Sequence, residues 1–255
     1  THSSFSTPLE LMAFIQQLRT LSEGKPVGFK LCIGHPWEWF AIVKAMLETG
    51  IQPDFIVVDG AEGGTGAAPL EFSDHMGMPL QEALRLVHNT LVGAGLRDSI
   101  HVGASGKIVS AFDMARALAL GADWCNSARG FMFALGCIQA QTCHSGNCPT
   151  GVTTQDPTRQ MALVVPSKAE RVQNFHAHTL EALQELMEAS GLRTPHDFTP
   201  RHIMRRVSET QTLHLSDLVD TVQVGALLQD NVSTLPPVFG DWPLSSAKSF
   251  SLQAA

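Results

Sequence analysis

The chain has 255 residues, of which 44% are hydrophobic and 16% are charged, and its formal net charge is −7. A chain of this length and apolar content can bury a core without disulfides or a structural metal, which excludes a disordered protein. The negative charge argues against a nucleic-acid partner, because phosphate backbones attract basic surfaces. No apolar run approaches the ~20 residues that a bilayer requires, and the first residues lack a signal-peptide pattern. We therefore expect a cytoplasmic protein that does not enter a membrane.

The first elements follow from apolar spacing and from helix start and stop residues. Apolar residues at helical spacing predict a helix that opens at Thr7-Pro8. A short apolar run over 27–33 predicts a buried strand. Pro36 then begins a second helix, which Gly50 ends.

The same strand and helix unit repeats along the next part of the chain. Strands are predicted over 54–59, 99–103 and 124–127, with helices that begin near Pro79 and after Ser110. Such alternation predicts right-handed βαβ units and a parallel sheet. Only about four units are visible before the pattern changes, whereas a closed (β/α)8 barrel needs eight.

The C-terminal part has a different pattern. One long amphipathic helix is predicted over 166–190, followed by a helix from Arg201, and the segment from about Gln229 is expected to be a loosely held terminus. We divide the chain into residues 1–165, with the βα units, and a helical extension over 166–255. Periodicity leaves open whether the tail helices pack on these units or form the face of a homo-oligomer.

A Gly-rich segment follows the second strand, at the edge where parallel α/β proteins bind ligands. It holds four glycines within seven positions, and its candidate ligand-binding residues are Gly63, Gly64, Thr65 and Gly66. Glycines allow backbone N–H groups to approach a flat or anionic ligand. The alternative is a flexible connector, and the position at a strand end favours a ligand.

Two further loops of small residues occupy the equivalent positions after the next two strands. They are Ser105, Gly106 and Lys107 after the third strand, and Ser127, Ala128 and Arg129 after the fourth. Consecutive loops of this kind that run into helix N-termini form a phosphate site in barrels. For Arg129, the alternative is an exposed residue at a helix start.

Lys30 places a charge in the middle of an apolar strand. A buried, unpaired lysine is costly, so Lys30 should meet an anion or a polarised ligand atom. The alternative is a lysine at the strand edge whose alkyl stem reaches solvent.

Three closely spaced cysteines, Cys137, Cys143 and Cys148, form what we call the cysteine trio. In a reducing compartment such clustering indicates metal or redox chemistry before disulfides. The gaps of five and four residues match neither a usual zinc site nor a bacterial ferredoxin, but three thiolates suit a cluster of three irons. A zinc site with His144 as fourth ligand is the alternative. The two remaining cysteines lie in apolar runs and are expected to be small core residues: Cys32 and Cys125.

These elements together resemble the FMN-binding synthase domain of glutamate synthase, in the variety without a fused glutaminase. The cysteine trio resembles that family's [3Fe-4S] ligand motif, and Asp59–Pro69 resembles its SGHDGGTGASP loop. Residues 148–157 resemble its CPVGVATQDP segment almost residue for residue, and Gly121–Cys137 resembles its last barrel strand. The resemblance runs from about Lys25 to about Ser190.

The resemblance implies the C-terminal half of a TIM (β/α)8 barrel with an iron–sulfur loop and a helical tail. The N-terminal half of the barrel would then be a partner, because half a barrel alone leaves an open sheet edge. The implied activity is the FMN-dependent reductive amination of 2-oxoglutarate to L-glutamate. The [3Fe-4S] cluster would relay electrons from ferredoxin or from a reductase subunit.

The resemblance also implies roles for the candidate residues. Lys30 would be catalytic, beside the flavin ring and the 2-oxoglutarate site, and residues 63–66 would line the isoalloxazine. The loops 105–107 and 127–129 would hold the flavin phosphate, and the cysteine trio would ligate the cluster.

Some positions depart from the family's pattern. Ala61 and Glu62 stand where His and Asp are expected, and Ala104-Ser105 replaces a Thr-Asp-type pair. No cysteine precedes Cys32, so the chain is not expected to release ammonia from glutamine. Two alternatives stay open: another FMN-dependent barrel that acts on a different oxo or hydroxy acid, and a non-catalytic electron-transfer module.

Overall fold

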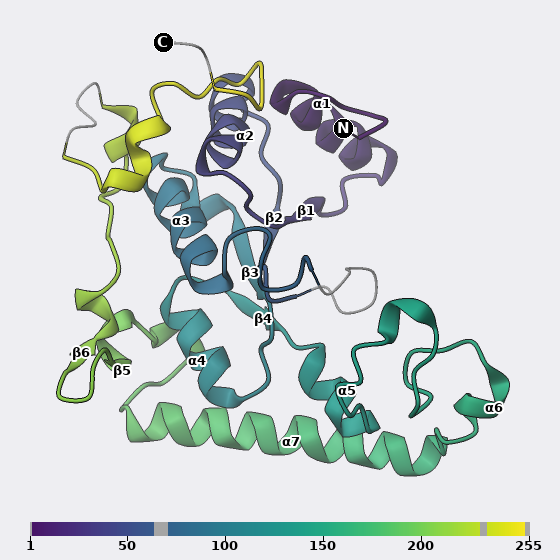
Figure 1. Cartoon of the computed structure of the whole chain (residues 1–255). Coiled ribbons are helices and arrows are strands. Elements are labelled where there is room, and N and C mark those ends of the chain that lie inside the picture. Colours follow the sequence, from purple (N-terminus) through teal and green to yellow (C-terminus); the bar gives the residue numbers. More distant parts are fainter. Residues whose placement is uncertain (1, 64–70, 230–233, 253–255) are drawn as a thin grey trace.

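The computed structural model describes residues 2–63, 71–229 and 234–252, and its centre is a four-stranded parallel sheet in the order β1-β2-β3-β4 (Figure 1). The strands have the bounds β1 Gly28–Leu31, β2 Phe55–Asp59, β3 His101–Ser105 and β4 Trp124–Asn126. Strands that follow one another in the chain are neighbours in the sheet, as in a barrel wall. The parallel α/β class is confirmed, and the described residues contain no closed barrel.

Helices α1 to α4 begin close to the residues that the sequence predicts, and α2 also ends there. Their bounds are α1 Pro8–Leu21, α2 Pro36–Thr49, α3 Leu80–Gly93, α4 Ala111–Ala119 and α5 Arg129–Leu135. Thr7 caps α1 in a capping box with Glu10, and Ser110 does the same for α4 with Asp113. Gly50 ends α2 in the left-handed conformation at φ 69°, which a glycine adopts without steric cost.

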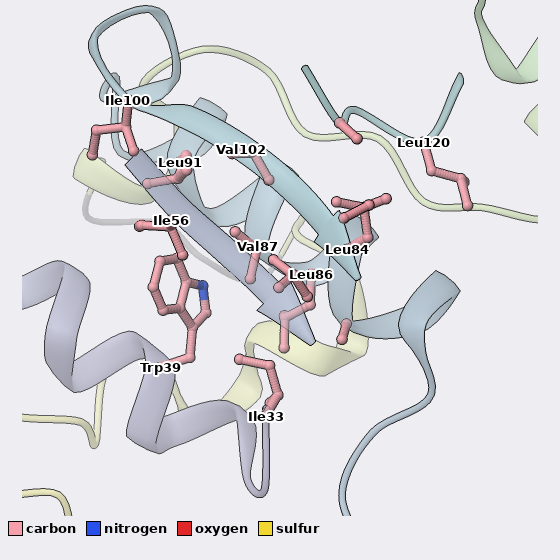
Figure 2. Packing of buried hydrophobic residues seen from close by; sticks show 14 of the residues in the cluster. Ile33, Trp39, Ile56, Leu84, Leu86, Val87, Leu91, Ile100, Val102 and Leu120 are labelled. Atoms are coloured by element: carbon pink, nitrogen blue, oxygen red, sulfur yellow. The ribbon is translucent and has the colours of Figure 1, made fainter. Parts of the chain in front are cut away.

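One face of the sheet packs against α2 and α3. Ile56 of β2 and Val102 of β3 are fully buried, and Trp39 from α2 and Leu84 from α3 pack into the same layer (Figure 2). Fully burying side chains of this size stabilises the fold by about 1.5–3 kcal/mol each. The layer therefore fixes the strands whose carboxyl ends carry the candidate site.

The opposite face of the sheet carries two aromatic rings that lie over glycines. A Cβ atom on Gly28 would stand 2.5 Å from the ring of Phe55, and one on Gly103 would stand 2.5 Å from the ring of Trp124. The two rings meet edge to face at 6.1 Å and border an open hollow of about 480 Å³. Neither ring is fully buried, so this face is less covered than the other in the part that the structure describes.

The predicted long helix is present as α7, Val165–Ala189, preceded by the short α6, Pro157–Gln160. It lies along α4 and α5, with Leu183 buried (Figure 1). Phe175 of α7 meets Phe131 of α5 edge to face, with 5.2 Å between ring centroids. Within this chain, α7 thus packs on the βα units.

The helix predicted from Arg201 is wrong. A 3-10 turn over Pro200–His202 leads into a two-stranded antiparallel hairpin, β5 Met204–Arg206 and β6 Thr212–His214. The N–H of Leu215 donates to the carbonyl of Ile203 at 2.8 Å. Backbone N–H and C=O groups of this region are therefore paired between two segments and not within a helix.

The expectation of a loosely held terminus is wrong for the described residues 234–252. Phe239 and Trp242 are 1% and 6% exposed, and both rings contact Phe40 of α2, with centroids 5.5 and 5.6 Å away. The Nζ atom of Lys44 also lies 5.2 Å from the Trp242 ring. Phe239 and Trp242 therefore hold this Ser-, Pro- and Gly-rich segment on α2. The division of the chain into residues 1–165 and 166–255 stays a prediction.

Among the helices of the described ranges, none combines the length and the apolar character that crossing a bilayer requires.

Candidate functional site

The carboxyl ends of the strands bring polar residues together on the less covered face of the sheet. Asp59, Ser105 and Asn126 are paired in register across β2, β3 and β4, so their side chains share one face. Lys30 of β1 pairs with Val57, which lies on that same face. The sheet register therefore places one cation and one anion among neutral polar groups at one edge.

Lys30 is paired with a carboxylate. Its Nζ atom lies 2.9 Å from Oδ2 of Asp59, and the Lys30 side chain is 52% exposed. The exposure agrees with the alternative interpretation, in which the lysine reaches solvent, and Asp59 supplies an anion as the first interpretation required. The ammonium group is thus both partnered and reachable from outside.

The Gly-rich loop after β2 contacts the loop after β3. The N–H of Gly60 donates to the carbonyl of Ser105 at 2.8 Å. Gly106 has a φ of 145°, and a Cβ there would stand 3.2 Å from the Gly60 nitrogen. Gly106 is required for this close approach, because other residues rarely adopt that conformation.

Of the candidate residues in the Gly-rich loop, Gly63 is described, whereas Gly64, Thr65 and Gly66 lie outside the described residues. A Cβ on Gly63 would stand 3.0 Å from Oδ1 of Asp59. The backbone at Gly63 therefore lies directly beside the carboxylate that holds Lys30.

Glu62 has a structural function at this edge. Both of its carboxylate oxygens accept a hydrogen bond from the N–H of Leu80 at 3.0 Å, at the start of α3. An anion at a helix N-terminus is favourable, so Glu62 caps α3 and ties the Gly-rich loop to it.

Lys107 forms an ion pair with Asp74, with 2.6 Å between Nζ and Oδ2. Both residues have positive φ, 46° for Lys107 and 68° for Asp74, which is uncommon for residues with side chains. The ion pair joins the β3–α4 loop to the segment before α3. Lys107 therefore lies at the loop where it was predicted, with a carboxylate as its partner.

The two predicted phosphate loops are joined by a hydrogen bond. The hydroxyl of Ser127 donates to the carbonyl of Ile108 at 2.8 Å, which links the loop after β4 to the loop after β3. The Nε atom of Arg129 is buried and has no hydrogen-bond partner in the described ranges. An unsatisfied buried guanidinium nitrogen is costly, and an anion would satisfy it. Ala128, between these residues, is exposed.

The cysteine trio converges on one pocket. Cys137 follows α5, Cys143 begins a 3-10 turn, and Cys148 is buried, and all three line a small pocket with Met132 and Pro149. In the described part of the chain, no three His, Cys, Asp or Glu side chains are grouped to hold one metal ion. The thiolates of an iron–sulfur cluster bind different iron atoms and need no common ion.

Cys148 carries an acidic thiol. Burial raises its pKa, but hydrogen bonds from Thr150 and from the backbone of Thr153 outweigh that effect and lower the pKa to about 6. The hydroxyl of Thr150 lies 3.4 Å from the Cys148 sulfur. A thiol of this kind is largely a thiolate at neutral pH, which is the form that binds metals.

The other two cysteines differ from the trio. Cys32 is exposed just beyond β1, so the expectation that it is a core residue is wrong. Cys125 is partly buried, and burial raises its pKa to about 12. Neither shares the pocket of the cysteine trio.

Sequence reasoning did not select Asp59, Asp74 or Asn126 as site residues. Asp59 and Asn126 are the last residues of apolar strands, and that position was an available signal. Asp74 lies in a segment without a motif, and only the fold brings it to Lys107.

Comparisons with known proteins find similar sequences over most of the chain. A family described as "Conserved region in glutamate synthase" matches residues 1–193. A protein of Bacillus subtilis named glutamate synthase large subunit-like protein YerD is 43% identical over 215 residues, which cover 84% of this chain and 41% of that protein. An archaeal glutamate synthase [NADPH] of Methanocaldococcus jannaschii is 36% identical over 183 residues, covering 70% of this chain and 35% of that protein.

A third relative is the ferredoxin-dependent glutamate synthase 1, chloroplastic/mitochondrial, of Arabidopsis thaliana, 30% identical over 219 residues. These cover 78% of this chain and 13% of that protein. The chain thus spans less than half the length of these relatives. Among solved structures, a flavocytochrome b2 variant with benzoylformate has a TM-score of 0.45 and 16% identity, over 73% of this chain and 37% of that one.

Proposed function

Since the chain belongs to the glutamate synthase family, we propose that it is the part of an FMN-dependent synthase that carries the flavin-phosphate and iron–sulfur sites. The proposed reaction is the reductive amination of 2-oxoglutarate to L-glutamate. The observation that carries the proposal is the convergence of the cysteine trio on one pocket. The ion pair of Lys30 and Asp59 at the carboxyl ends of the strands supports it. The proposed setting is the cytoplasm, without a nucleic-acid or membrane partner.

The less covered face of the sheet supports a second half of the barrel as a partner. Phe55 and Trp124 lie on the face that would be the barrel interior, and interior positions of such barrels are filled by layers of side chains. The hollow of about 480 Å³ beside them is where side chains of the remaining strands would pack. We therefore propose that four further strands, from another part of the protein, complete the barrel.

The residues of the two loops fit an FMN phosphate. The Nε atom of Arg129 is a buried donor without a partner in the described ranges, and the Ser127 hydroxyl is held beside Ile108. A phosphate would satisfy Arg129 through a charge-assisted hydrogen bond. Ser105, Gly106 and Lys107 precede Ile108 in the neighbouring loop, to which Ser127 is hydrogen-bonded, and we propose that they also border the phosphate. Gly63 to Gly66 are proposed to line the ring.

When bound, FMN would supply a hydride to the substrate, and the cluster would supply single electrons to the flavin. The chain's own residues would position the substrate and the flavin and would neutralise their negative charge. Lys30 would hold a substrate carboxylate or negative charge on the flavin, since it is a reachable cation at the strand edge. Asp59 keeps the ammonium of Lys30 in place at 2.9 Å. Ferredoxin or a reductase subunit is the proposed electron donor.

Iron content tests the cluster. Purified under anaerobic conditions, the chain should contain roughly three irons, with matching acid-labile sulfide and the paramagnetic resonance signal of an oxidised three-iron cluster. Cys148→Ser should lose the signal and most of the iron. Cys32→Ser is the matched control, because Cys32 is exposed and lies outside the pocket of the cysteine trio, and it should keep both. Stoichiometric zinc without iron would refute the cluster.

Flavin binding and turnover test the rest of the proposal. The chain combined with the N-terminal part of its full-length protein should retain FMN and should form glutamate from 2-oxoglutarate and ammonia. Turnover of lactate or glycolate instead would identify a different FMN-dependent enzyme. A cluster without FMN, even in the full-length protein, would favour an electron-transfer module.

A further inference from the structure

A cleft lies between α3 and the C-terminal segment, away from the sheet edge and the cysteine trio. Its volume is about 240 Å³. We call it the α3 cleft, and its polar and charged lining residues are Gln81, Glu82, Arg85, Asn89, Arg205 and Asp220. Part of this lining comes from residues beyond 193, where the match to the glutamate synthase family ends.

One stripe of α3 supplies polar groups to the cleft. Gln81, Arg85 and Asn89 are four residues apart and therefore lie on one side of the helix. The carbonyl of Asp220 accepts a hydrogen bond from Arg85 Nε at 2.7 Å and another from Asn89 Nδ2 at 3.0 Å. These two bonds fix the Arg85 guanidinium against the C-terminal segment.

The guanidinium of Arg85 has unused donors. Burial lowers the pKa of Arg85, and the negative charge of Asp220 offsets this effect only in part. Within the described residues its two terminal nitrogens make no hydrogen bond, and the carboxylates of Glu82 and Asp220 form no ion pair with it. A guanidinium held in this way presents a pair of donors that match a carboxylate.

The rest of the α3 cleft is apolar. Leu218 and Val238 are 39% and 38% exposed and give the lining its accessible apolar surface, whereas Leu215 and Phe239 are almost fully buried. The volume accommodates roughly eight water molecules at about 30 Å³ each, so it suits a ligand with a similar number of non-hydrogen atoms. An apolar wall with a few placed polar groups is the usual composition of a small-molecule site, and here the charged groups are Arg85, Arg205, Glu82 and Asp220.

We propose that the α3 cleft binds a small carboxylic acid with an apolar chain, whose carboxylate pairs with Arg85 and whose chain packs on Leu218 and Val238. This site is separate from the proposed catalytic edge.

Calorimetric titration of the full chain tests the site with three compounds of one carbon skeleton. They are 4-methylpentanoate, leucine and 4-methylpentan-1-ol. We expect at least one of the two acids to bind with a Kd below about 1 mM, and the uncharged alcohol to bind at least tenfold more weakly. Binding of the alcohol as tight as that of the acids, or no binding of either acid, would overturn the proposal.

Three single-residue variants test whether the acids bind in the α3 cleft. Arg85→Gln should weaken acid binding at least tenfold without changing alcohol binding. Arg171→Gln removes an equal charge from an exposed position on α7 and should change neither. Leu218→Trp, at a lining residue that is 39% exposed, fills the cleft and should weaken both compounds, which keeps the test decisive if Arg85→Gln does not fold. Unchanged acid binding in Leu218→Trp would refute the site.

Discussion

The Nζ atom of Lys30 lies 2.9 Å from Oδ2 of Asp59, across the carboxyl ends of two neighbouring parallel strands. The two residues are far apart in the sequence and meet because β1 and β2 are paired in register. The pair is the charged centre of the candidate site. Because it is partly open to solvent, a substitution of Lys30 can change activity without much change in the free energy of unfolding.

We predict that Lys30→Met changes the free energy of unfolding by less than about 1 kcal/mol, because half-exposed ion pairs contribute little. Under the proposed function, the same substitution should reduce turnover of the full-length protein by about a hundredfold, as loss of charge stabilisation does. Urea unfolding and steady-state kinetics measure the two quantities. Loss of stability and activity in proportion would show that Lys30 is structural.

We predict that Gly130→Ala destabilises the contact between α5 and α7. A Cβ on Gly130 would stand 2.6 Å from Cζ of Phe175, and that ring is held against Phe131. Overpacking of this kind costs about 1–3 kcal/mol. Gly240→Ala is the matched control, because a Cβ there meets no atom within 4 Å, and it should be neutral. Thermal unfolding of both variants measures the difference in stability, and equal melting temperatures would contradict the prediction.

We predict that stability falls as the pH is lowered below about 6.5 because of His88. Burial, followed by the positive charges of Arg85 and Arg97, lowers the pKa of His88 to about 4. Its Nδ1 atom accepts a hydrogen bond from Arg97 Nε at 3.3 Å, which requires the neutral ring. The unfolded chain protonates first on acidification, so the folded state loses stability between pH 6.5 and 4.

The expected loss from His88 is about 2 kcal/mol at pH 5 relative to pH 8, since one pKa unit corresponds to about 1.4 kcal/mol. Urea unfolding at several pH values measures it. The loss should be smaller in His88→Gln, which stays neutral throughout. An unchanged pH dependence in that variant would assign the effect to other groups.

We predict that Trp242→Ala destabilises the chain by about 3–5 kcal/mol, as truncation of a buried aromatic residue does. The ring packs against Phe40 and beneath Lys44, so its loss should also free residues 234–252. Limited proteolysis and thermal unfolding measure both effects. A change below about 1 kcal/mol would mean that the segment is loosely held after all.

The sequence by itself determined most of the local structure of the βα units, and it indicated candidate residues for the site. Helix caps such as Thr7 and Gly50, and apolar runs such as that of β2, are decided by neighbouring residues, and each was predictable. The spacing of the cysteine trio likewise indicated a cluster, because its members are close in the chain.

The tertiary structure decided which distant residues meet. Asp59 reaches Lys30 through strand register, Asp74 reaches Lys107 through loop packing, and Asp220 reaches Arg85 across the α3 cleft. The hairpin after Pro200 and the packing of Trp242 on α2 also depend on partners far along the chain. Local propensity carries no information on such contacts, because the free energy that selects them comes from burial between distant segments.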